Sequence, residues 1–106
     1  MRKIISIGKL SKQASLRIAG LMSGTSADGV DVAIIDFAID ALKVLAFDTY
    51  PYPPCVGKAI SKLFRNEKTM VSDICHLNFA IGEVFADAIL KLCRKSRISI
   101  NSIDLI

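Results

Sequence analysis

Three strand-like segments joined by short connections occupy the first half of this 106-residue chain and limit the folds that it can adopt. The first covers residues 17–22, and the second, residues 30–37, is rich in Val and Ile and apolar on both faces. The third covers residues 42–47. The connections carry Gly and Asp, which are typical of tight turns. Such short connections predict an antiparallel β-meander with residues 30–37 as its buried central strand.

The second half of the chain changes to helical periodicity. Pro54 suits the first position of a helix, and apolar residues follow it at helical spacing as far as Phe64. A second helix is predicted over residues 72–95, and residues 103–106 then read as the start of a fourth strand. The apolar stripe of the second helix consists of Ile74, Leu77, Ile81, Val84, Phe85, Ala88 and Leu92. We therefore expect an α/β fold in which an antiparallel β-meander is followed by two helices and the start of a fourth strand.

Composition and charge exclude several classes of protein. Hydrophobic residues make up 52% of the chain, which excludes disorder, and no run approaches the roughly 20 apolar residues that span a bilayer. The net charge of +4 comes from residues 1–27, which hold five basic residues and no acid. The rest of the chain is nearly balanced and has no interleaving of basic and aromatic residues. We expect neither a nucleic-acid partner nor a membrane partner.

The three cysteines and the N-terminal residues point to a cytoplasmic protein. Cys55, Cys75 and Cys93 form no CxxC pair, so we expect buried, reduced thiols. Residues 1–16 are a basic extension that we expect to be flexible and outside the domain of residues 17–106. Their apolar part is too short for the roughly 7–15 residues of a signal-peptide core. An organelle transit sequence remains the alternative to a dispensable extension.

The connection between the first two strands, residues 23–31, is the segment with chemical character. Gly24 and Gly29 have the spacing of a P-loop, but the two residues after Gly29 are not the required Lys and Ser/Thr, so a Walker site is excluded. Small residues offer backbone N–H groups and hydroxyls to a phosphate. Asp28 and Asp31 would repel that phosphate unless a divalent cation lay between them. The pattern indicates a Mg²⁺-dependent nucleotide-phosphate site, with a surface hairpin as the alternative.

Other polar residues are predicted to have structural positions. His76 is expected on the solvated face of the second helix, where Glu83 and Asp87 form a carboxylate pair one turn apart. Tyr50 and Tyr52 flank a proline and are expected to pack at a junction between strand and helix, although they could also line a pocket.

Residues 20–31 resemble the N-terminal signature of the anhydro-N-acetylmuramic acid kinases, a family of the actin/sugar-kinase superfamily with ribonuclease-H-like lobes. The family string Met-Ser-Gly-Thr-Ser-x-Asp-Gly-x-Asp is matched without a break from Met22 to Asp31. The resemblance extends over residues 17–106. It implies that the chain is the N-terminal part of a ribonuclease-H-like, actin-like ATPase lobe.

The resemblance also implies an activity. Members of this family use ATP to phosphorylate 1,6-anhydro-N-acetylmuramic acid while water opens the anhydro ring, which yields N-acetylmuramic acid 6-phosphate in peptidoglycan recycling. Asp28 lies where the superfamily places a carboxylate near Mg²⁺, so it is the candidate metal ligand, directly or through water. By resemblance, the ATP phosphate-binding element comprises Gly24, Thr25, Ser26, Ala27, Asp28, Gly29, Val30 and Asp31.

The family's catalytic base lies beyond Ile106, so no catalytic residue is assigned in this chain. Much of the sugar and adenosine pocket lies there as well, and phosphoryl transfer needs base, metal and substrates in one cleft. We expect the chain to be inactive alone and to need a missing C-terminal lobe as its partner. A homodimer remains open. The alternative is a non-catalytic remnant or interaction module, and the exposed edge of a fourth strand predicts self-association of the isolated chain.

Overall fold

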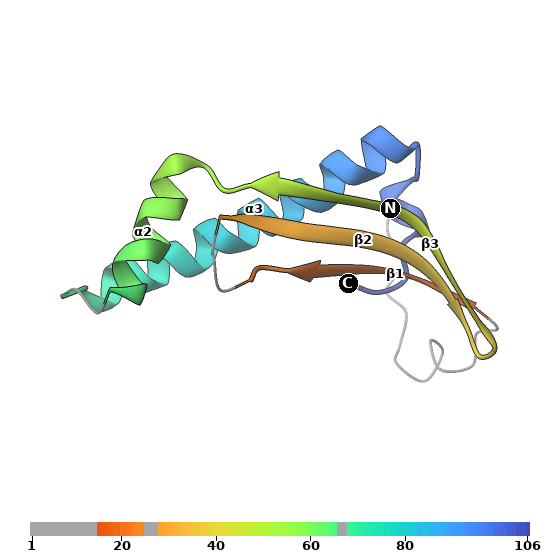
Figure 1. Cartoon of the computed structure of the whole chain (residues 1–106), viewed down its shortest axis with the longest axis horizontal. Coiled ribbons are helices and arrows are strands. Elements are labelled where there is room, and N and C mark those ends of the chain that lie inside the picture. The colour runs from red at the N-terminus through yellow and green to blue at the C-terminus, as the bar shows by residue number, and fades with distance from the viewer. Residues whose placement is uncertain (1–14, 25–27, 66–67) are drawn as a thin grey trace.

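The computed structural model describes residues 15–24, 28–65 and 68–106. It contains a three-stranded antiparallel sheet in the order β1-β2-β3, followed by two helices and a short 3₁₀ helix (Figure 1). The elements are β1 (Ser15–Met22), β2 (Gly29–Ala38), β3 (Ala41–Pro51), α2 (Pro54–Phe64), α3 (Val71–Ser96) and η1 (Ile100–Ser102). The predicted β-meander and both predicted helices are confirmed.

The first strand begins earlier than the sequence predicted. Ser15 and Leu16 pair with Ala38 and Phe37, so they belong to β1 although the N-terminal extension was expected to include them. Both residues continue the antiparallel pairing with the last residues of β2, which explains the earlier start. Residues 1–14 of the expected extension lie outside the described part of the chain.

The central strand β2 separates two faces of the sheet. Val30, Val32 and Ile34 are completely buried, as expected for alternate residues of a strand that point to one side. We call this side the inner face, and α3 runs along it (Figure 1). The intervening residues, among them Asp31 and Ala33, are only partly buried and belong to the outer face. The sequence predicted that β2 would be a buried central strand. Its inner face is completely buried, whereas its outer face is only partly buried.

The helices pack their apolar residues against the inner face. Helix α2 buries Val56 and Ile60. Helix α3 buries Leu77, Ala88, Ile89, Leu92 and Cys93. Ile74, which was predicted for the apolar stripe, is 48% exposed because it lies in the first turn of α3. Among the described helices, none has both the length and the apolarity needed to cross a membrane.

The expectation of buried cysteines is wrong for two of the three. Cys93 is buried, and this burial raises the pKa of its thiol. Cys55 and Cys75 are exposed. They lie near the first turns of α2 and α3, and Cys55 lines the pocket between these two helices.

The last residues of the chain run beside β1. The N–H of Ala19 donates to the carbonyl of Leu105 at 2.9 Å, and Leu105 forms a parallel bridge with Ile18. The predicted start of a fourth strand is therefore present as a single bridge. The 3₁₀ helix η1, which no sequence pattern indicated, leads into it.

Arg17 connects this C-terminal segment to the sheet. Its Nε donates to Asp36 Oδ1 at 2.8 Å and its Nη1 donates to Ser102 Oγ at 3.1 Å. Its backbone N–H donates to Asp104 Oδ2 at 2.8 Å. The hydrogen bond from the guanidinium holds the pKa of Asp36 below its usual value. Arg17 thus ties β1 to β2 and η1 through its side chain, and to the segment after η1 through its backbone.

Replacement of Asp36 by Asn should change how stability depends on pH. The folded pKa of Asp36 lies below the unfolded one, so its contribution is present above about pH 4 and is lost as the pH falls through the folded pKa. Asp36→Asn should therefore lose less stability than the wild type between about pH 6 and about pH 3. Urea midpoints at the two pH values measure this. Asp40→Asn, in the exposed β2–β3 turn, is the control, and an unchanged pH dependence in Asp36→Asn would contradict the ion pair.

Candidate functional site

The candidate phosphate-binding connection lies between β1 and β2, at the end of the sheet nearest α2 (Figure 1). Gly24 and Asp28 are exposed there. Thr25, Ser26 and Ala27 lie outside the described residues, so their assignment stays a prediction. Ser23 and Asp28 mark the two ends of the connection that the structure describes.

Tyr52 holds both of these ends. Its backbone N–H donates to the carbonyl of Asp28 at 3.1 Å, and its hydroxyl donates to Ser23 Oγ at 2.8 Å. Tyr52 itself is only 8% exposed, so packing fixes its ring. The spacing of Ser23 and Asp28 therefore depends on a residue that follows β3 and lies outside the motif.

Only an indirect signal for this role of Tyr52 is present in the sequence. Tyr52 was predicted to pack at a strand–helix junction, and its burial confirms that packing. Its contact with the connection depends on the strand register, because Gly29 lies opposite Pro51 and the next residue therefore reaches Asp28. No spacing rule in the sequence supplies that register.

The two glycines of the motif have different surroundings. A Cβ atom on Gly29 would lie 2.7 Å from the carbonyl oxygen of Tyr50, so β2 and β3 approach too closely there for any other residue. A Cβ atom on Gly24 would meet nothing within 4 Å among the described residues. Gly29 is thus needed for the sheet, whereas no atom of the described residues fills the space beside Gly24.

Val30 and Asp31 point to opposite faces of β2. The side chain of Val30 is completely buried in the core, so only its backbone is available to a ligand. Asp31 lies on the outer face, where its Oδ1 accepts a hydrogen bond from Thr49 Oγ1 at 2.7 Å. Thr49 therefore fixes the orientation of this carboxylate.

A hollow of about 310 Å³ borders the carboxylate of Asp31 on the outer face. It is otherwise lined by apolar residues and a glycine, namely Gly20, Leu21, Met22, Ala33 and Phe47. Within the described ranges, no three His, Cys, Asp or Glu side chains gather into a metal site. A divalent ion held by one of these carboxylates would complete its shell with other oxygen ligands, such as water and phosphate.

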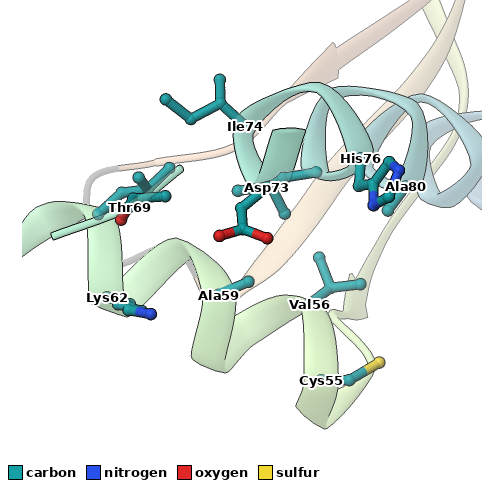
Figure 2. A pocket seen from close by; sticks show the side chains of 11 residues that line it. Cys55, Val56, Ala59, Lys62, Thr69, Asp73, Ile74, His76 and Ala80 are labelled. Carbon is teal, nitrogen blue, oxygen red and sulfur yellow. The ribbon is translucent and has the colours of Figure 1, made fainter. Parts of the chain in front are cut away.

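A second pocket, of about 380 Å³, lies between α2 and α3 and shares no residue with the motif (Figure 2). Val56, Ala59 and Leu77 contribute apolar surface to it. The carboxylate of Asp73 points into the space between the two helices (Figure 2). His76 also lines this pocket and is exposed, as the sequence predicted.

Comparisons with known proteins agree with the motif. The family model for anhydro-N-acetylmuramic acid kinase matches residues 16–106. A protein of that name from Caldanaerobacter subterraneus subsp. tengcongensis is 44% identical over 93 residues, which cover 84% of this chain and 24% of the relative. A protein of the same name from Bacillus cereus strain Q1 is 38% identical over 84% of this chain and 24% of the relative. One from Pasteurella multocida is 35% identical over 83% of this chain and 23% of the relative. The chain spans about a quarter of the length of these curated relatives.

Tyr52→Phe should loosen the connection while it leaves the fold intact. The loss of one hydrogen bond should lower the free energy of unfolding by about 1 kcal/mol. It should also speed amide hydrogen exchange at residues 23–29, measured by mass spectrometry. The matched control is Tyr50→Phe, which removes a buried hydroxyl beside Asp48 that makes no hydrogen bond to Ser23 or Asp28, so it should not speed exchange in the connection. Equal effects of the two variants would contradict the role of the Tyr52 hydroxyl.

Proposed function

The chain belongs to the anhydro-N-acetylmuramic acid kinase family, and from this premise we propose that it supplies the ATP phosphate-binding part of such a kinase. The reaction would transfer a phosphoryl group from ATP to 1,6-anhydro-N-acetylmuramic acid, with hydrolytic opening of the anhydro ring. The observation that carries the proposal is the connection from Ser23 to Asp28, which combines the family's motif with ends held by Tyr52.

The connection has the properties that phosphate binding requires. Its small residues allow a phosphate to approach backbone N–H groups, and the hydroxyls of Thr25 and Ser26 add further donors. Among the described residues, none blocks the approach of a phosphate to Gly24. Because Tyr52 fixes the ends, the donors would be arranged before the nucleotide arrives, which lowers the entropic cost of binding.

The carboxylates of the connection fit a Mg²⁺ site of the kind found in phosphoryl-transfer enzymes. Mg²⁺ is often held by one or two carboxylates, with waters and phosphate oxygens completing its shell. Asp28 is exposed at the end of the connection and would hold the ion directly or through water. When bound, the ion would neutralise charge between the carboxylate and the phosphates.

The remaining machinery would come from additional polypeptide. We assign no catalytic residue in this chain, and its relatives are about four times as long as the region they share with it. The chain would therefore form one wall of a cytoplasmic cleft and be inactive alone. The competing possibility is that the chain is a non-catalytic interaction module. Absence of Mg²⁺-dependent nucleotide binding would favour this second possibility.

The effect of Asp28→Asn on nucleotide binding tests the proposal. A suitable protein is a full-length chimera in which residues 16–106 replace the matching part of the Caldanaerobacter relative. Asp28→Asn should weaken binding of ATP in the presence of Mg²⁺ by about tenfold or more, as expected when a charged metal ligand is lost. Isothermal titration calorimetry measures the affinity.

Two comparisons make this result specific. Asp40→Asn, in the β2–β3 turn, should leave the affinity unchanged. Without Mg²⁺, the Asp28→Asn variant and the wild type should bind ATP with the same affinity, because the carboxylate of Asp28 acts through the ion. An unchanged affinity in Asp28→Asn, or an equal loss with and without Mg²⁺, would refute the assignment of Asp28.

A further inference from the structure

The outer face of the sheet is apolar where a solvated face would be polar. Large apolar side chains from all three strands lie on it with about half of their surface exposed: Met22 (61%), Phe37 (45%), Leu42 (59%), Val44 (58%) and Phe47 (62%). Strand register places them on this one face, opposite the buried inner residues. No described element covers it (Figure 1).

The pattern differs from that of an antiparallel sheet with one face in water. Such a sheet normally alternates apolar residues on the covered face with polar ones on the solvated face. Here the polar side chains of the outer face are Asp31 and Thr49, which pair with each other beside the phosphate-binding connection. A continuous exposed apolar surface of this kind marks an interaction site.

The length of the relatives indicates what covers this face. About three quarters of each kinase lies outside the region shared with this chain. We propose that the outer face is the docking surface for the polypeptide that corresponds to those three quarters, with an apolar side chain of that partner seated in the hollow beside Asp31. This inference rests on the proposed function, since it takes the partner from the same kinase.

The position of the hollow favours this face over other exposed apolar residues. Phe79, which is 73% exposed on α3, contributes to neither the hollow nor the connection. By contrast, Phe47 and Met22 line the hollow together with Asp31. A partner docked on the outer face would thus lie beside Asp31, next to the phosphate-binding connection.

Cysteine accessibility in intact proteins tests the docking surface. Phe47→Cys, Phe79→Cys and Asp40→Cys are each introduced into the 106-residue chain and into the full-length chimera, with Cys55 and Cys75 replaced by Ser. The rate of alkylation at each introduced thiol is read by mass spectrometry of its peptide. Phe47→Cys should react at least tenfold more slowly in the chimera than in the isolated chain. Asp40→Cys, in the exposed turn, should react at the same rate in both.

The other outcomes would overturn the proposal. Equal reactivity of Phe47→Cys in both proteins would show that the partner does not cover the outer face. Protection of Phe79→Cys without protection of Phe47→Cys would place the partner on α3 instead. Protection of Phe47→Cys in the isolated chain, accompanied by dimers in light scattering, would make a second copy the occupant.

A second measurement does not depend on folding of the chimera. The affinity-tagged chain is produced in the same cells as the remaining part of the Caldanaerobacter relative, and the amount of co-purified partner is measured. Phe47→Asp should reduce the amount of co-purified partner at least tenfold, and Asp40→Asn should leave it unchanged. Docking would be refuted if Phe47→Asp recovered as much partner as the wild type, or if the wild type recovered no partner. Neither assay contains nucleotide. Failure of docking can therefore be distinguished from failure of Mg²⁺-dependent ATP binding, because each can occur without the other.

Discussion

The register of the central strand β2 is the constraint on which the candidate site depends. Val30, Val32 and Ile34 are completely buried on the inner face, and a shift by one residue would move all three to the opposite side. This register places Asp31 on the outer face beside Thr49. It also places Gly29 against β3, at the point where the next residues bring Tyr52 to the connection.

The two ends of the sheet are held by different means. At one end, Arg17 joins β1 and β2 to the C-terminal segment through Asp36 and Ser102. At the other end, Tyr52 holds the connection through one backbone and one side-chain hydrogen bond. The connection therefore has a fixed base although its exposed residues carry the motif. A phosphate-binding turn needs this combination, because its donors must be accessible and yet already in place.

The sequence predicted the elements well because each has a local signal. The Val- and Ile-rich run gave β2, and Pro54 marked the first residue of α2. Features that depend on contacts distant in sequence were not predictable. The hydrogen bond from Tyr52 to Ser23 spans 29 positions and follows from register alone, and the exposure of Ile74 follows from where α3 meets the sheet. The roles of the motif residues, including those of Thr25 to Ala27, remain predictions from resemblance.

Phosphorylation of 1,6-anhydro-N-acetylmuramic acid can be measured to decide whether the chain is one part of a kinase. The chain is assayed with ATP and Mg²⁺, alone and after co-expression with the remaining part of the Caldanaerobacter relative. We expect no turnover by the chain alone, and formation of N-acetylmuramic acid 6-phosphate when both parts are present. Turnover by the chain alone would contradict the claim that it forms only one wall of the cleft. Absence of turnover with both parts present and associated would contradict its role as the phosphate-binding part of the kinase.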